Sequence, residues 1–166
     1  MSVLRLVAFV ACGAFVWMVG LSTVPSTARF GVAAVVIGAT VTQPFGCTDV
    51  ALEPITARCR SRHFHSGIDL AAPAGTEVFS ATSGVVSTGT DSAGAGNYVA
   101  VQYDRHTRIL YCHLSSFSVR PGQHVEAGQL IGTVGSTGLA TGPHLHLEVD
   151  VSGRPVEPSA WLAATS

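Results

Sequence analysis

The chain has 166 residues, of which 47% are hydrophobic and only 11% are charged, and its formal net charge is -1. This length is enough for one domain with a short appendage, and a domain of more than about 100 residues can bury a core unaided. All nine basic residues are Arg. The chain therefore has no basic surplus for nucleic acid, and without Lys it has no P-loop, Schiff-base or biotinyl-carrier chemistry.

Residues 1–28 have the pattern of an export segment. Leu6–Val24 is an uncharged run of nineteen residues between Arg5 and Pro25. Such a run can cross a membrane as a helix, and a buried core helix is the less favoured alternative. Small residues at 26–28 also suit a signal peptidase. We expect a cleaved signal peptide or a retained anchor that engages the membrane or the secretion machinery, with the remainder exported to face the periplasm or cell wall.

The rest of the chain is predicted to be a β domain at 41–162, preceded by an apolar linker at 29–40 that is too short for a second membrane span. Short β-branched runs alternate with Gly turns, and no stretch has a clear helical period. The expected fold is all-β: an antiparallel two-sheet sandwich or open barrel with Gly-rich turns, plus the N-terminal apolar helix. The predicted strands are Glu77–Ala81, Gly84–Gly89, Asn97–Tyr103, Arg108–Leu114, His124–Glu126, Leu130–Val134 and His144–Val151.

The cysteines fit an exported domain. Cys47 and Cys59 flank a polar loop, and an oxidising compartment favours a disulfide between them. A metal-binding pair is the alternative, but structural zinc cysteines usually lie only two to four residues apart. Cys112 lies in a strand-like run and is expected to be a packed thiol rather than a catalytic one.

Histidines are numerous for a chain so poor in charge, and three short motifs contain most of the chemistry. His144 and His146 are two residues apart on a strand, so both project from one face. His65 and Asp69 flank a Gly that lets the chain bend, and imidazole with carboxylate is a ligand set that zinc accepts. Alternation in the third motif places His113 and Tyr111 on one face of a strand, with Cys112 on the other.

Each motif alone is weak evidence for a site. A hydrogen-bonded structural pair is the common explanation for two His on a strand, and an Asp after a Gly can simply cap a turn. Their combination and order are more specific. The remaining histidines, His63, His106 and His124, are expected to have no role in a site.

The ordered motifs resemble those of the lysostaphin-type, LytM-like zinc metalloendopeptidases of bacterial cell walls. The resemblance covers nearly the whole domain. Its segments include V-T-Q-P-F-G at 41–46, H-S-G-I-D-L-A-A-P at 65–73, G-N-Y-V at 96–99 and G-S-T-G-L-A-T-G-P-H-L-H at 135–146. The sequence departs from many relatives at Cys47 and the insert at 48–62, where those relatives carry an Arg soon after F-G.

The resemblance implies a site with one Zn²⁺ per domain. The zinc ligands would be His65, Asp69 and His146, and the catalytic His113 and His144 would flank the water. Asn97 would support the site by hydrogen bonding. The implied activity is hydrolysis of peptide cross-links or stem peptides of peptidoglycan outside the cytoplasmic membrane. The alternative is a catalytically silent relative that binds the cell wall or activates another wall hydrolase.

Overall fold

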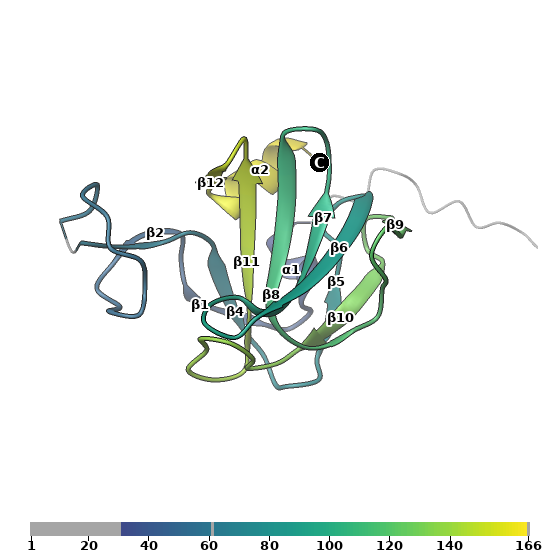
Figure 1. The fold of residues 1–166 in the computed structure, drawn as a ribbon, viewed down its shortest axis with the longest axis horizontal. Helices are drawn as coiled ribbons and strands as arrows, with labels where there is room; N and C mark the ends of the chain where they lie inside the picture. The colour runs from purple at the N-terminus through teal and green to yellow at the C-terminus, as the bar shows by residue number, and fades with distance from the viewer. Residues whose placement is uncertain (1–30, 61, 166) are drawn as a thin grey trace, which may run out of the picture.

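The computed structural model describes residues 31–60 and 62–165, which form a β domain with two short helices (Figure 1). The strands are β1 (Thr40–Gln43), β2 (Gly46–Thr48), β3 (His63–His65), β4 (Ile68–Ala71), β5 (Glu77–Phe79), β6 (Gly84–Asp91), β7 (Gly96–Gln102), β8 (Thr107–Phe117), β9 (His124–Val125), β10 (Leu130–Val134), β11 (His144–Val151) and β12 (Arg154–Val156). The helices are α1 (Val32–Val35) and α2 (Pro158–Thr165).

Ten of these strands form one antiparallel sheet. Its main path runs β1-β4-β11-β8-β7-β6-β9, while β12 pairs with β11, and β10 pairs with both β5 and β8. The described strands do not close this sheet into a barrel, and β2 and β3 pair separately as a two-stranded sheet. The predicted all-β antiparallel class is therefore confirmed, although where a two-sheet sandwich or open barrel was expected, the described strands form one large sheet and a second sheet of only two strands.

The seven predicted strands all appear, with ends shifted by at most a few residues. Their inward side chains form the core, which includes Ile109, Tyr111, Leu145 and Leu147, each with no exposed surface. The predicted N-terminal helix and export segment at 1–28 lie outside the described residues. Among the residues that the structure describes, no helix is long and apolar enough to span a membrane.

The apolar stretch at 29–40, expected only as a linker, contributes to the domain core. Its described part contains α1, and both Val35 and Val36 are almost fully buried in the main hydrophobic cluster. Burial of the two side chains contributes to stability by the hydrophobic effect, roughly 1.5–3 kcal/mol for each fully buried valine. The chain therefore begins to pack before the predicted domain start at residue 41.

The α2 helix was not expected from periodicity, and its start signals explain it. Both carboxylate oxygens of Glu157 accept hydrogen bonds from backbone N–H groups of the first turn, those of Ser159 and Ala160. Pro158 occupies the first helical position, where its missing N–H costs nothing. With only two turns, capping and the buried Leu162 define this helix better than any repeat in its sequence.

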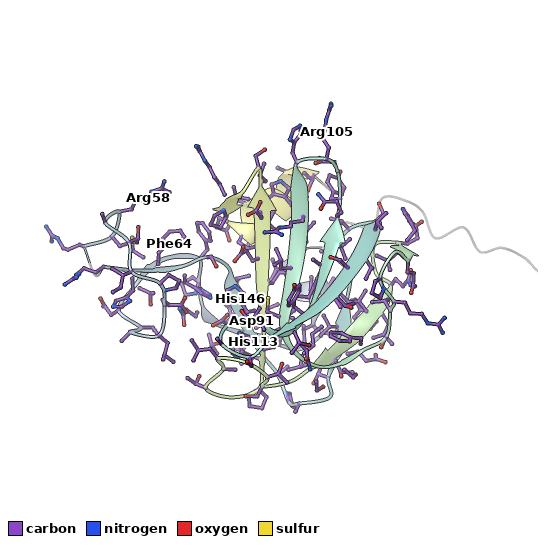
Figure 2. The ribbon with its side chains drawn as sticks, in the orientation of Figure 1. Arg58, Phe64, Asp91, Arg105, His113 and His146 are labelled. Carbon is purple, nitrogen blue, oxygen red and sulfur yellow. A yellow bond between two sulfur atoms is a disulfide. The ribbon has the colours of Figure 1, made fainter. Side chains whose placement is uncertain are left out.

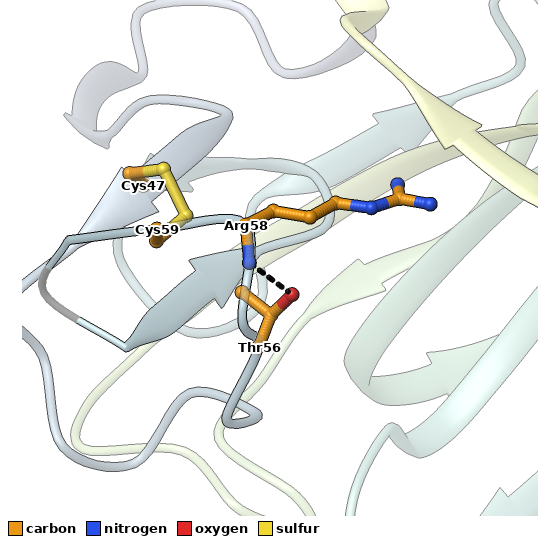
Figure 3. Close-up of a disulfide and its surroundings, with 4 residues drawn as sticks. All are labelled: Cys47, Thr56, Arg58 and Cys59. Carbon is orange, nitrogen blue, oxygen red and sulfur yellow. Dashed lines mark hydrogen bonds between the residues drawn. A yellow bond between two sulfur atoms is a disulfide. The ribbon is translucent and has the colours of Figure 1, made fainter.

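The insert at 48–62 projects from the side of the large sheet, as the segment after β2 shows in Figure 1. The predicted disulfide is present: Cys47 and Cys59 are bonded, with their Cα atoms 5.4 Å apart (Figure 3). Inside the insert, Thr56 N–H donates to the Arg62 carbonyl oxygen at 2.6 Å, and Phe64 N–H on β3 donates to the Pro54 carbonyl oxygen of the insert at 3.0 Å. The insert is thus cross-linked by both a covalent bond and backbone hydrogen bonds.

Removing the disulfide should destabilise the domain. In the chain-entropy model, a closed loop of this size contributes about 2–3 kcal/mol to the free energy of unfolding. We expect the double variant Cys47→Ser, Cys59→Ser to lose about this amount, as measured by urea denaturation. Thiol labelling of the denatured, non-reduced chain should leave Cys47 and Cys59 unlabelled, with the free Cys112 as positive control. Labelling of both would show that no bridge forms.

Candidate metal centre

Strand register brings the central residues of the site side by side. Asp69 on β4 is paired with His146 on β11, and His146 is paired with Cys112 on β8, so the three lie in one row across neighbouring strands. His65 reaches the same point from β3, across the short bend at Gly67. A Cβ at Gly67 would lie 2.4 Å from the Leu147 carbonyl oxygen and 2.7 Å from the His146 ring, so only glycine fits this approach.

Three donor atoms converge at this point: His65 Nε2, Asp69 Oδ1 and His146 Nδ1. The two histidine atoms are 3.0 Å apart, and Asp69 Oδ1 lies 3.1 Å from the first and 3.0 Å from the second. His65 Nδ1 lies 2.9 Å from the Pro44 carbonyl oxygen, which can only accept a hydrogen bond. His65 Nδ1 therefore carries the proton, and Nε2 presents a lone pair to the other two donors.

This arrangement fits a divalent metal ion. Electron-pair donors this close repel one another unless a proton or a cation lies between them. A tetrahedral zinc ion with bonds of about 2.0–2.1 Å has ligand atoms about 3.3 Å apart, close to the observed separations. Two imidazoles and one carboxylate leave a fourth position for water or substrate. Among the described residues, this is the group of His, Cys, Asp and Glu side chains that could hold such an ion.

The electrostatics also favour a cation. Burial opposes the charge of Asp69, but hydrogen bonds with His146 and His65 outweigh it and hold the pKa of the carboxyl well below its usual value. Burial likewise acts to lower the pKa of His146, but Asp69 and Glu148 outweigh it and raise this pKa to about 9. Glu148 is a second ionised carboxylate, with Oε2 3.7 Å from His146 Nε2. The site thus concentrates negative charge around the convergent donors.

His113 enters the site through a β-bulge. Two residue steps on β7, from Val99 to Asn97, oppose three steps on β8, from Tyr111 to Leu114, so β8 contains one extra residue. His113 is in this bulge with a φ of 64°, a left-handed conformation that is uncommon outside glycine, and its N–H donates to the Ala95 carbonyl oxygen at 2.8 Å.

The bulge corrects the predicted facing of these side chains. Tyr111 does not share a face with His113: it is fully buried in the core, where its hydroxyl accepts a hydrogen bond from Ala81 N–H at 2.8 Å. Cys112 lies on the site side with His113 instead. Simple alternation fails because the left-handed residue breaks the two-residue repeat. Burial raises the pKa of the Cys112 thiol to about 12, which agrees with the predicted packed, unreactive thiol.

His113 and His144 lie next to the three donors without being part of them. Their rings are 4.7 Å apart between centroids, and those of His113 and His146 are 6.1 Å apart; Figure 2 labels the latter pair. His113 Nδ1–H donates to the Thr137 carbonyl oxygen at 2.8 Å, and His144 Nδ1–H donates to the Gly142 carbonyl oxygen at 2.8 Å. Each Nε2 is therefore free of a backbone partner, and burial lowers the pKa of His113, which favours its neutral form.

Of the residues that support the site, Asn97 was expected from the sequence, whereas Thr137 and Ser66 were not. Thr137 accepts from His113 through its carbonyl oxygen, while its hydroxyl donates to the Leu114 carbonyl oxygen and accepts from Asn97 N–H. Asn97 thus supports the site through Thr137, and its own side chain also donates to the Leu114 carbonyl oxygen. Ser66 donates to Glu148 behind His146. Main-chain acceptors such as those of Pro44 and Thr137 have no signature in the sequence, because any residue supplies a carbonyl.

The other histidines lie elsewhere. His63 is in the small sheet, where its Nδ1 donates to the Glu53 carbonyl oxygen at 2.7 Å. His106 is in the turn between β7 and β8, and His124 is in β9. The structure therefore brings together the five residues predicted for the site and leaves out these three.

A groove contains the site. It is bounded by the insert, by the turn between β6 and β7, and by the loop between β10 and β11. Its lining residues are Gln43, Val50, Leu52, Glu53, Pro54, Ser66, Asp69, Ala93, Gly94, Ala95, Leu110, Cys112, His113, Leu139, Thr141, His144, His146 and Glu148. The convergent donors thus line a groove that is open to solvent.

Comparison with known proteins gives consistent matches. The chain is 42% identical over 118 residues to the DD-carboxypeptidase/endopeptidase Mpg of Neisseria meningitidis, covering 71% of this chain and 26% of that protein. The fold matches the catalytic domain of the antimicrobial peptidase lysostaphin from Staphylococcus simulans, with a TM-score of 0.63 and 30% identity over 75% of this chain and 92% of that one. It also matches a zinc-containing peptidase from Vibrio cholerae, with a TM-score of 0.64 and 33% identity over 79% and 38% of the two chains.

The chain spans about a quarter of the length of the curated relatives that it matches first. The model of peptidase family M23 matches residues 63–158, which is more than half of the chain and includes all five predicted site residues. The expected resemblance to lysostaphin-type peptidases is thereby confirmed. By this match, and by the strand arrangement that it shares with solved members, the chain belongs to peptidase family M23.

Proposed function

We propose that this protein is a zinc-dependent endopeptidase that hydrolyses peptide cross-links or stem peptides of bacterial peptidoglycan outside the cytoplasmic membrane. The observation that carries the proposal is the convergence of His65 Nε2, Asp69 Oδ1 and His146 Nδ1 within 3.1 Å of one another, in a groove that also contains His113 and His144. The similarity to the DD-carboxypeptidase/endopeptidase Mpg and to the zinc-containing peptidase from Vibrio cholerae supports it.

The metal would be held by His65, Asp69 and His146. When bound there, zinc polarises a carbonyl and lowers the pKa of water from about 15.7 toward 7. The chain itself holds the three ligand side chains in place: the Pro44 carbonyl oxygen orients His65, and Glu148 faces the outer nitrogen of His146. Such outer partners fix the ring orientation of a metal ligand.

His113 and His144 would move the protons. Each has Nδ1 committed to a backbone carbonyl, so the neutral ring presents an Nε2 lone pair that can accept a proton from water. Once protonated at Nε2, the ring can donate a hydrogen bond to the developing oxyanion and return the proton to the leaving amine. The two rings come from different strands, β8 and β11, and lie 4.7 Å apart between centroids, so both would be next to the same water.

Digestion of purified peptidoglycan of known cross-link type tests this activity. Mass analysis of the fragments should show new amine and carboxylate ends within the peptides and intact glycan chains. Chelation should abolish release, and added zinc should restore it. Release of glycan fragments, or no release from any cross-link type in the presence of zinc, would contradict the proposal.

Single substitutions test the division of roles. His146→Ala should lose zinc and most activity, because three protein ligands are the minimum for a catalytic zinc site. His113→Ala and His144→Ala should keep close to one zinc per chain while turnover falls roughly 10²- to 10⁴-fold, the range for a general base or an oxyanion donor. Zinc content and turnover are measured on the same preparations.

Three outcomes of this series would overturn the assignments. Stoichiometric zinc in His146→Ala would remove this residue from the ligand set. Loss of zinc from His144→Ala with retention in His146→Ala would exchange the roles of the two histidines. Full turnover in both His113→Ala and His144→Ala would exclude them from proton transfer.

A further inference from the structure

The tip of the insert carries a cluster of positive charge. This basic tip, residues 56–60 and 62, contains Arg58, Arg60 and Arg62 and no acidic residue, and all three Arg are exposed. Figure 2 shows Arg58 on the projecting insert, away from His113 and His146. The cluster therefore lies outside the groove that contains the convergent donors.

The three guanidinium groups of the basic tip form no ion pair with a carboxylate among the described residues. The Arg that does so is Arg108, whose side chain lies 3.9 Å from that of Asp150. Glu53, which belongs to the same insert, is instead hydrogen-bonded to Gln43 Nε2 at 2.9 Å. Three like charges in so short a segment repel one another, so binding of an anion among them is favoured.

The backbone of the basic tip is held in place. Cys59, which lies between two of the Arg residues, is bonded to Cys47. Arg58 N–H donates to Thr56 Oγ1 at 3.3 Å (Figure 3), and Arg62 N–H donates to the Cys59 carbonyl oxygen at 3.0 Å. Arg62 has a φ of 69°, which is uncommon outside glycine, and the closed loop holds it there. A preorganised backbone loses little conformational entropy when a ligand binds.

The residue type and its repetition favour a polymer of phosphodiesters. A guanidinium group is always charged, and its planar fork can bind two phosphate oxygens at once. A single small anion neutralises one such group, whereas a chain of phosphates can reach all three, and linked contacts raise the total affinity. The groove repels the same ligand, because Glu53, Asp69 and Glu148 line it and no described Arg does. A polyanion would therefore bind at the tip and leave the groove open.

The composition of the insert separates this ligand from two others. Residues 48–62 include no Trp, Tyr or Phe. Such side chains stack on the bases of single-stranded nucleic acids, and they anchor proteins at the membrane interface. A lipid surface also requires an apolar face, but among the described insert residues Ile55 is the one large aliphatic that does not line the groove. These observations favour a polymer that is recognised through its phosphates alone.

We infer that Arg58, Arg60 and Arg62 form a binding site for a linear phosphodiester polymer, separate from the groove. The guanidinium groups bind phosphates along one chain, which lies across the basic tip. Such a site tethers the protein wherever this polymer is abundant, whatever bond is cleaved in the groove. The inference therefore does not depend on the proposed function.

A fluorescently labelled glycerol phosphate oligomer tests this site on the full chain, kept in neutral detergent with metal removed by chelation. Fluorescence anisotropy should show saturable binding that weakens with salt. The slope of log K against log salt concentration should be about −2, because each of three neutralised phosphates releases about 0.7 counterion. The triple variant Arg58→Gln, Arg60→Gln, Arg62→Gln should bind roughly 100-fold more weakly, about a factor of five for each Arg.

A second triple variant, Arg105→Gln, Arg120→Gln, Arg154→Gln, is the matched control. It removes the same charge from exposed positions on the body of the domain, so it should bind the oligomer as the wild type does. Polyglutamate and a soluble short-chain phosphatidylglycerol should compete poorly for the site. A thymidine oligonucleotide should compete no better than the unlabelled oligomer.

Two results with the variants would overturn the inference: equal losses in both triple variants, which would show a response to net charge alone, or no loss in the first. Stronger competition by polyglutamate, the lipid or the oligonucleotide than by the oligomer itself would also overturn it, because the tip would then belong to another class of ligand. Unfolding temperatures of both variants separate lost contacts from a folding defect. Arg60→Gln alone, with an expected loss of about fivefold, repeats the test with a smaller change.

Discussion

The antiparallel register of β4, β11 and β8 is the constraint on which the site depends. It places Asp69, His146 and Cys112 in one row, and a shift by a single residue would turn His146 to the opposite face of the sheet. The same strands bury Leu70, Leu145 and Leu147 on the core side. The hydrophobic core therefore fixes the register, and the register brings the proposed ligands Asp69 and His146 together. Gly67 completes the set, because only a residue without a side chain lets His65 approach the ring of His146.

Backbone carbonyls control the histidine chemistry of the groove. Those of Pro44, Thr137 and Gly142 each take a hydrogen bond from Nδ1 of one ring and so decide which nitrogen is available. The bulge at His113 belongs to the same arrangement. A left-handed residue inside a strand costs of order 1–3 kcal/mol, and such conformations gather at functional sites. The left-handed conformation of His113 takes its side chain out of the two-residue alternation of β8 and places its ring next to that of His144.

Much of this could be predicted from the sequence, for reasons that particular residues make clear. Two-residue alternation and Gly turns identified the main strands, and the resemblance of the ordered motifs to lysostaphin-type peptidases implied His65, Asp69 and His146 as the candidate ligands. The predicted orientation of the Tyr111 side chain was wrong, because a pattern of alternation does not reveal the one extra residue in β8. The α2 helix was missed because Glu157 defines it through capping, not through period. The partners of the imidazoles are mostly carbonyl oxygens, which no residue type reveals.

We propose that His65, Asp69 and His146 hold one zinc ion through His65 Nε2, Asp69 Oδ1 and His146 Nδ1. Anomalous diffraction at the zinc absorption edge, from crystals of the zinc-loaded chain, tests it most directly. We expect one strong peak about 2.0–2.1 Å from each of these three atoms, with His113 and His144 outside bonding distance. A peak bonded to His113 or His144 in place of one of these three residues, or no peak in the groove, would contradict it.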